Sequence, residues 1–149
     1  MSTAIHLATS ADLDALLTLV ARFHEEMGIA SDDAMRRAGL EPLLEGSPLG
    51  AAYLFGPARA PIGYVVVTFG WSLEFGGMDS FVDEIYIRPS VRNRGIGTET
   101  LIAVGKALQG AGVTALHLEV KRDDRATQRL YEKAGFGLRD QYCLMTRRL

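Results

Sequence analysis

The sequence predicts one domain of the mixed α/β class, an α+β arrangement in which helices flank a central twisted mixed sheet. The length of 149 residues suits a single ordinary domain. A content of 48% hydrophobic and 23% charged residues is typical of a globular protein with its own core. Strand-like and helix-like segments follow one another in the order βααββ, βαβα, β, which indicates mixed α/β structure around one sheet. Residues 1–149 are therefore interpreted as one domain.

The chain begins with a short strand and two helices. Ala4–Ala8 is expected to be the strand, and Thr9 with Asp12 has the spacing of a helix capping box. A helix is predicted from there to Gly28, and Ser31 is expected to cap the next one. The first helix rests on apolar residues at helical spacing, namely Leu13, Leu16, Leu17, Val20 and Phe23.

The middle of the chain supplies most of the predicted sheet. Ala51–Phe55 is an apolar island that favours a strand, and residues 56–61 have the Gly/Pro composition of a turn. Ile62–Ser72 is rich in β-branched and aromatic residues and predicts a long strand. A loop over Glu74–Asp79 is expected to lead into a further strand at Phe81–Ile87.

The last third is predicted to alternate between helices and strands. A helix is expected to begin at Gly97, followed by a buried strand at Val113–Val120. Asp124–Ala134 has helical spacing of apolar residues, and Gly135 is expected to end that helix. Gln141–Arg147 is predicted to be the final strand.

Composition argues against several classes of function. A net charge of −2 disfavours a nucleic-acid binder, which is normally basic. The longest apolar stretch, Ile62–Leu73, is interrupted by polar residues and glycine and is shorter than the roughly 20 residues of a membrane helix. No signal peptide is expected, and the single cysteine, Cys143, favours a reducing, cytoplasmic location. The histidines are scattered without a metal-binding motif, so no metal is expected.

The clearest chemical signal is the glycine-rich step Arg92-Asn93-Arg94-Gly95-Ile96-Gly97 between a strand and a helix. The start of a helix exposes unpaired N–H groups that suit a phosphate, and glycines let the backbone approach it closely. Three arginines lie within residues 88–94, which favours a pyrophosphate. Thr98 stands where a Walker A loop needs lysine, and Thr100 where a dinucleotide fingerprint needs glycine, so ATP and NAD are disfavoured. The alternative interpretation is a plain turn with solvated arginines.

Two motifs together resemble the GNAT superfamily of N-acetyltransferases. The first is Arg92-x-x-Gly95-x-Gly97, which follows a strand ending in Ile87-x-Pro89. The second is the late helix and its end, Ala126-x-x-x-Leu130-Tyr131-Glu132-Lys133-Ala134-Gly135-Phe136. The similarity covers Phe81–Phe136 and implies an enzyme that moves an acetyl group from acetyl-CoA to an amine by direct attack. Asp124 and Thr127 depart from the pattern, because the family often has Asn and Ala there.

The resemblance also implies where acetyl-CoA would bind. Backbone amides of residues 92–98 would hold the pyrophosphate, and the pantetheine arm would lie beside residues 85–87 like an added strand. The implied cofactor-binding residues are Ile85, Tyr86, Ile87, Arg92, Asn93, Arg94, Gly95, Ile96, Gly97, Thr98, Asp124, Thr127 and Tyr131.

Acetylation of an amine needs a base and an acid, because an alkylamine is protonated at neutral pH and the departing thiolate must receive a proton. Periodicity alone makes Tyr131 a core aromatic residue, whereas the resemblance implies that it protonates the thiolate. Asp83 and Glu84 are the candidate bases, with Asp83 ranked first. Adjacent strand residues face opposite sides of a sheet unless a bulge intervenes, so only one of them should reach the acceptor.

The acceptor is expected to be a small cationic or lysine-like primary amine. Trp71, Glu74 and Asp83 are the candidate substrate residues, because aromatic and acidic side chains suit a cation with an apolar stem. Residues 71–79 could equally be an ordinary hairpin connection with exposed carboxylates. Two alternatives stay open: a peptide or protein N-acetyltransferase of the same fold, and a non-catalytic acyl-CoA-binding regulatory module. A homodimer also stays open.

Overall fold

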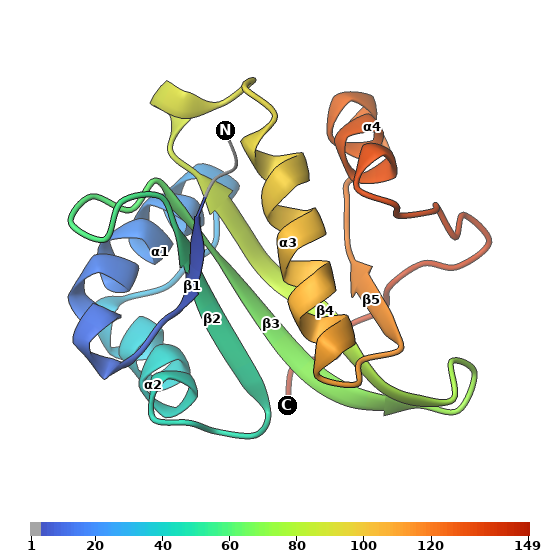
Figure 1. The fold of residues 1–149 in the computed structure, drawn as a ribbon, viewed down its shortest axis with the longest axis horizontal. Coiled ribbons are helices and arrows are strands. Elements are labelled where there is room, and N and C mark those ends of the chain that lie inside the picture. Colours follow the sequence, from blue (N-terminus) through green and yellow to red (C-terminus); the bar gives the residue numbers. More distant parts are fainter. Residues whose placement is uncertain (1–3) are drawn as a thin grey trace.

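The computed structural model describes residues 4–149 and contains a five-stranded sheet with helices on both faces (Figure 1). The strands follow the order of the sequence, and β4 and β5 are parallel whereas the other neighbours are antiparallel. The strands are β1 (Ile5–Leu7), β2 (Gly50–Phe55), β3 (Gly63–Ser72), β4 (Gly77–Ile87) and β5 (Ala115–Leu118). The helices are α1 (Leu13–Met27), α2 (Asp33–Leu44), α3 (Ile96–Gly110) and α4 (Arg125–Lys133), with 3-10 turns at Ser10–Asp12 and Pro89–Val91. The mixed α/β class and the single flanked sheet are confirmed.

The sheet separates two hydrophobic cores. Helices α1 and α2 pack on one face, where Leu16 and Leu40 meet Tyr64 of β3 and Tyr86 of β4. Helix α3 packs on the other face, with α4 at the margin of that core. The alternation of side chains along β3 explains this division, since Val65 and Val67 belong to one core and Tyr64 and Val66 to the other.

Helix boundaries agree with the sequence at most ends. Gly28 ends α1 in the left-handed conformation, with φ of 69°. The carboxylate of Asp12 accepts the Thr9 N–H at 2.9 Å, as the capping-box spacing predicted. Asp32 caps α2 in place of Ser31, because its side chain accepts the N–H of Met35 at 2.8 Å. None of the helices in residues 4–149 is long and apolar enough to cross a membrane.

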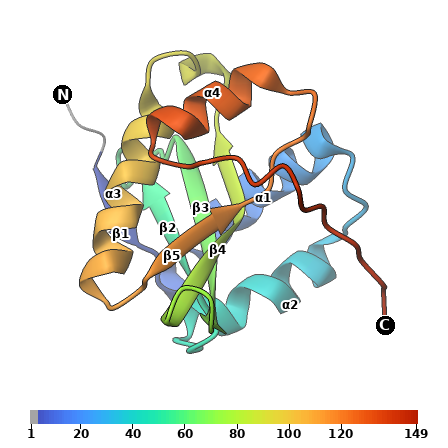
Figure 2. The same cartoon turned by 90° about the vertical axis from the view of Figure 1, so that its right-hand side faces the viewer.

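The predicted strand over Gln141–Arg147 is wrong. After Phe136 the chain runs as an exposed segment that passes α4 and β5 without joining the sheet (Figure 2). Arg139 attaches it to the β3–β4 hairpin through a 2.8 Å ion pair with Glu74. Residues 142–145 are apolar in an unbroken row, which fits a strand locally, but a strand also needs a partner edge and this segment pairs with none.

The loop predicted over Glu74–Asp79 is shorter than expected. Strand β4 already begins at Gly77, because Met78 pairs with Trp71 and Asp79 with Gly70 across a tight hairpin. The predicted strand at Val113–Val120 shrinks to β5, since the pairing of this segment with β4 ends at Leu118.

A β-bulge interrupts β4 just beyond Val82, the last residue of β4 that pairs with β5. Val66 of β3 pairs with Glu84, and Val67 pairs with Val82, so Asp83 has no partner on β3. Beyond Val82 the β5 side of β4 carries no strand pairing in the described part of the chain. The bulge and the open edge together create the irregular region in which the candidate site lies.

Candidate active site

The start of α3 presents a run of backbone N–H groups. The N–H of Glu99 bonds to the Gly95 carbonyl, so the first-turn amides of Ile96, Gly97 and Thr98 have no partner within the helix. Asn93 and Gly95 adopt positive φ angles of 63° and 77°, which curve the preceding backbone into the concave shape that favours an anion. Asn93, Arg94 and Gly95 are exposed. The loop therefore offers unpaired donors at the positive end of a helix, which suits a pyrophosphate.

The two glycines of this motif have different structural roles. Gly95 is the left-handed N-cap of α3, and open space surrounds the position of a Cβ there. Gly97 is buried, and a Cβ on it would lie 3.2 Å from Cδ1 of Ile87 and 3.4 Å from Cδ1 of Leu130. Gly97 therefore lets α3 pack closely against β4 and α4, a role that the sequence analysis had assigned to phosphate approach.

Arg92 fastens the loop to the rest of the domain. Its guanidinium forms two hydrogen bonds with the Glu26 carboxylate, at 2.6 and 2.7 Å, and Nε donates to the Ile87 carbonyl at 2.8 Å. The same group lies 5.6 Å from the centre of the Tyr86 ring. These hydrogen bonds hold the pKa of Glu26 below its ordinary value. The side chain of Arg92 thus positions the loop against α1, which leaves the backbone amides to meet a ligand.

The open edge of β4 adjoins this loop. Ile85 and Ile87 pack toward α3, and Tyr86 lies in the core beneath α1. Their backbone pairs with β3 on one side only, because β5 pairs with β4 no further than Val82. An extended ligand arm can add to this edge as another strand would.

Helix α4 lies beside the start of α3 and the open edge of β4, where its Leu130 approaches Gly97. The Asp124 carboxylate caps it by accepting the N–H of Thr127 at 3.1 Å and the Thr127 hydroxyl at 2.7 Å. These bonds lower the pKa of Asp124. Gln128 is buried and donates to the carbonyls of Lys121 and Arg122, at 3.0 and 2.8 Å, which fixes the segment between β5 and α4.

Tyr131 lies one turn further along α4. It packs against the α3-side core with its ring centre 6.1 Å from that of Phe136. Burial, aided by the charge of Asp124, raises the pKa of the Tyr131 hydroxyl. A tyrosine hydroxyl is already protonated at neutral pH, and the raised pKa of Tyr131 does not change this, so the group can act as a proton donor.

The two candidate bases occupy different surroundings. Glu84 lies beneath α1, where its Oε2 is 2.6 Å from Nε2 of His24 and its Oε1 accepts the Tyr64 hydroxyl at 2.8 Å. Asp83 is exposed at the bulge. Partial desolvation raises the pKa of Asp83, and the nearby charges of Glu84 and Glu119 raise it further.

The predicted acceptor residues are only partly brought together. Trp71 is 74% exposed at the end of β3, and Glu74 is paired with Arg139. The structure adds Phe81 of β4 and His117 of β5 to the aromatic and acidic residues expected over 71–79. The His117 ring lies 4.9 Å from Phe81 and 5.3 Å from Phe75, and its Nε2 is 3.1 Å from the Asp79 carboxylate. We call Phe75, Asp79, Phe81 and His117 the aromatic patch.

A sequence signal for the aromatic patch was present but incomplete. His117 alternates with apolar residues, which located it on a strand, yet nothing in the sequence showed that β5 pairs Phe81 with His117 in parallel register. Glu119 follows β5 directly and reaches Asp83 electrostatically for the same reason. His24 looks isolated in the sequence because its partner, Glu84, is 60 residues away.

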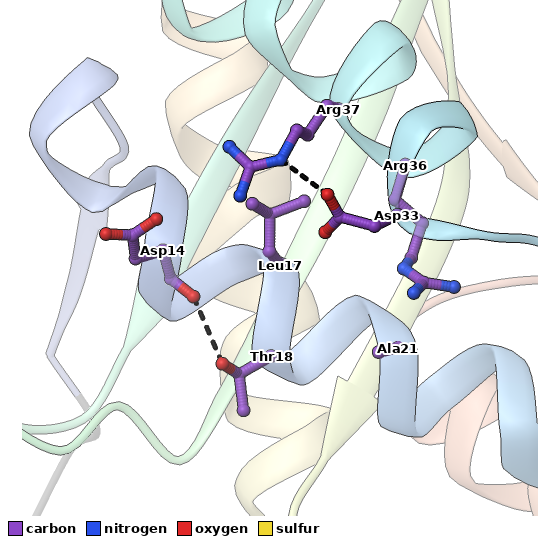
Figure 3. Close-up of a pocket in the computed structure, with 7 residues that line it drawn as sticks. All are labelled: Asp14, Leu17, Thr18, Ala21, Asp33, Arg36 and Arg37. Carbon is purple, nitrogen blue, oxygen red and sulfur yellow. Dashed lines mark hydrogen bonds and ion pairs between the residues drawn. The ribbon is translucent and has the colours of Figure 1, made fainter.

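A surface groove of about 340 Å³ lies elsewhere, between α1 and α2 (Figure 3). Asp33 pairs there with Nε of Arg37 at 2.6 Å, so the two charges largely compensate each other. The lining residues are Asp14, Leu17, Thr18, Ala21, Asp33, Arg36 and Arg37. None of the predicted site residues is among them, so this groove is not the candidate acyl-transfer site.

Comparison with known proteins places the chain in a family. Residues 45–136 match the Acetyltransferase (GNAT) family. An integron cassette protein from the mobile metagenome of Cole Harbour Salt Marsh is 29% identical, with a TM-score of 0.84 over 96% of this chain and 89% of that one. No curated protein matches significantly.

Two further solved structures share the fold over the whole of both chains. An aminoglycoside acetyltransferase, AAC(6')-Iy, in complex with a CoA bisubstrate analogue, is 16% identical with a TM-score of 0.81 and covers 100% of each chain. A ribosomal-protein-alanine N-acetyltransferase from Brucella melitensis biovar Abortus 2308 is 19% identical with a TM-score of 0.76, again with 100% of each chain covered. At these identities the likeness shows the fold alone.

The family match defines the class of protein, an acyltransferase that takes its acyl group from a CoA thioester. The chain belongs to the GNAT family of acetyltransferases, as the family match over residues 45–136 shows. The resemblance found in the sequence is thereby confirmed.

Proposed function

We propose that this protein transfers the acetyl group of acetyl-CoA to the primary amine of a small cationic acceptor. One observation carries the proposal: the exposed carboxylate of Asp83 lies on the same strand, β4, whose open edge leads to the free amides at the start of α3. A site for the acyl donor and a group that attracts an ammonium ion are thus neighbours.

The residues present fit acetyl-CoA. Backbone amides of residues 93–98 would hold the pyrophosphate, and the β4 edge at residues 85–87 would hold the pantetheine arm. When bound, acetyl-CoA supplies the acetyl thioester that the amine attacks. Asp124 and Thr127 contribute through the cap of α4, the helix that carries Tyr131.

Each polar group has a role that its surroundings support. Asp83 attracts the ammonium and takes its proton, which a carboxylate of raised pKa does more readily near neutral pH. The Tyr131 hydroxyl, protonated at neutral pH, donates the proton that the departing sulfur needs. Glu84 already accepts hydrogen bonds on both oxygens, which makes it the weaker candidate for the base.

The acceptor class follows from the surface beside Asp83. Phe81 is 43% exposed and stands two residues before Asp83 on β4, and its ring partner His117 stands two residues before Glu119. Ring faces and carboxylates together favour a cation that carries an apolar stem. The complex of the related fold with an acetylneamine analogue supports a polyamine-like acceptor in the same way.

A protein acceptor is the second candidate. The related fold of the ribosomal-protein-alanine N-acetyltransferase supports it, and so does the exposure of Trp71 and Phe81 on an open surface. A regulatory module without catalysis is less well supported, because Tyr131 and Asp83 are both present. The cytoplasmic location expected from the single cysteine belongs to this proposal.

An amine panel tests the proposal. Purified protein is given acetyl-CoA with diamines, polyamines, aminoglycosides, neutral amines and alanine-terminated peptides, and thiol release is recorded. We expect the highest kcat/KM for a di- or polycationic small amine. A preference for the peptides would favour the protein acceptor, and CoA binding without release on any amine would favour the regulatory module.

A further inference from the structure

His24 of α1 connects two segments that are far apart in the sequence. Its Nε2 lies 2.6 Å from Oε2 of Glu84 on β4, and its Nδ1 lies 2.6 Å from Oγ of Ser31 in the α1–α2 connection. The side chains of His24 and Glu84 are only 14% and 18% exposed. The contact is therefore a largely buried link between the helical layer and the bulged strand.

The hydrogen bonds of this link agree in direction. The Glu84 carboxylate only accepts, so the Tyr64 hydroxyl and the Nε2–H of His24 both donate to it. Nδ1 forms a hydrogen bond with the Ser31 hydroxyl at 2.6 Å, and the Ser31 oxygen also accepts Nη1 of Arg36 at 3.0 Å. Both oxygens of Glu84 thus have a donor, which fixes the direction of its carboxylate.

The direction of Glu84 matters because Asp83 is its neighbour in the chain. At the bulge the two carboxylates are not separated by regular alternation, and the charge of Glu84 acts on Asp83. Tyr64 and His24 bind both oxygens of Glu84 on the α1 side of the sheet, whereas Asp83 is exposed.

We propose that His24 is a positioning residue that holds Glu84 beneath α1 and thereby leaves Asp83 as the one carboxylate of this pair that faces the acceptor. Only the catalytic consequence rests on the proposed function. The titratable and charged groups around the pair come from each packed element, namely His24 of α1, Arg36 of α2 through Ser31, Tyr64 of β3, Tyr86 of β4 and Glu119 after β5.

A matched pair of substitutions separates positioning from simple packing. In His24→Gln the longer amide places a nitrogen near the position of Nε2 and can still donate to Glu84. In His24→Asn the shorter amide reaches only the position of Nδ1, so the bond to Ser31 survives and the bond to Glu84 is lost. Ser31→Ala removes the other contact of His24 without touching Glu84.

The first measurement is the titration of the Asp83 carboxyl by carbon NMR in the free protein, assigned with Asp83→Asn. His24→Asn and His24→Gln both remove the imidazole, whose charge lowers the pKa of Asp83, but only His24→Asn also frees Glu84 to approach Asp83. We therefore expect the Asp83 midpoint in His24→Asn to lie about half a pH unit or more above that in His24→Gln. His24→Gln and Ser31→Ala should shift it clearly less. Equal midpoints in His24→Asn and His24→Gln would overturn the inference.

A second measurement uses the wild-type protein alone. Nitrogen NMR of the wild-type imidazoles should show a proton on Nε2 of His24, and an Nε2 without a proton would contradict its hydrogen bond to Glu84. The pH profile of kcat/KM with putrescine completes the test: its acidic limb should move up in His24→Asn and stay near wild type in His24→Gln. An Asp83 shift without acetylation of any amine by the wild type would refute the proposed function and leave the positioning of Glu84 intact.

Discussion

Gly97 of α3 and Leu130 of α4 meet at the site, with only 3.4 Å between the position of a Gly97 Cβ and Cδ1 of Leu130. Cδ1 of Ile87 on β4 lies 3.2 Å from the same Cβ position. Gly97 therefore determines how closely α3, the edge of β4 and α4 approach one another. A side chain here changes the site through packing.

Gly97→Val should both destabilise the domain and weaken CoA binding. The added carbons overpack a buried contact, which costs on the order of 1–3 kcal/mol, and they push α4 away from the loop. Urea unfolding and a CoA titration measure the two effects. Gly95→Ala is the control, because open space surrounds that position and only its positive φ is strained. A Gly97→Val protein with wild-type stability and CoA affinity would show that the contact is unimportant.

Tyr131→Phe should lower kcat by on the order of 100-fold while the affinity for acetyl-CoA stays nearly constant. The substitution removes the hydroxyl but keeps the packing against the core that holds Phe136. Steady-state kinetics with a CoA titration separate the two quantities. If kcat stays within a few-fold of wild type, Tyr131 is a packing residue and another group protonates the sulfur.

Asp83→Asn should move the rise of the acetylation rate to higher pH, because the amine must then lose its proton to water. It should also weaken the binding of a cationic acceptor. Glu84→Gln, the matched variant, should act mainly on stability, since it alters the carboxylate that Tyr64 and His24 contact. The pH profiles of kcat/KM decide between them, and a shift caused by Glu84→Gln alone would reverse the assignment.

Asp83→Asn should also raise the stability of the free protein at neutral pH. The folded-state pKa of Asp83 is raised, so the native state binds its proton more tightly than the unfolded chain does. Stability is therefore lost as pH rises from the ordinary Asp value through the folded-state value, and asparagine removes this loss. Thermal unfolding of both proteins at acidic and neutral pH measures it, and a gain that is larger at acidic pH would contradict the sign.

The sequence predicted the elements better than it predicted the contacts between them. Local signals such as the apolar spacing of α1 and the glycines at the start of α3 depend on neighbouring residues, so those elements were found. The strand expected at Gln141–Arg147 failed because pairing depends on a distant edge. The bulge at Asp83 could be named only as an open alternative for the same reason, since a register shift is a property of two strands together.

The candidate site likewise has one part that local sequence could predict and another that depends on contacts between distant residues. The candidate pyrophosphate loop, residues 92–98, is one contiguous segment, so a local motif was enough to propose it. The partners of Glu84 and the aromatic patch come from α1, β3 and β5, and no spacing in the sequence joins His24 to Glu84 or His117 to Phe81. The role of Gly97 is likewise tertiary, because Leu130 contributes it from α4.

Transfer of an acetyl group from acetyl-CoA to an amine can be followed by mass spectrometry of a reaction with acetyl-CoA and putrescine, with free thiol recorded in parallel. We expect one N-acetylated amine for each thiol released, with strongly reduced amounts of both in Tyr131→Phe and Asp83→Asn. Thiol release without acetylated amine, for putrescine and for every other amine of the panel, would contradict acetyl transfer to an amine.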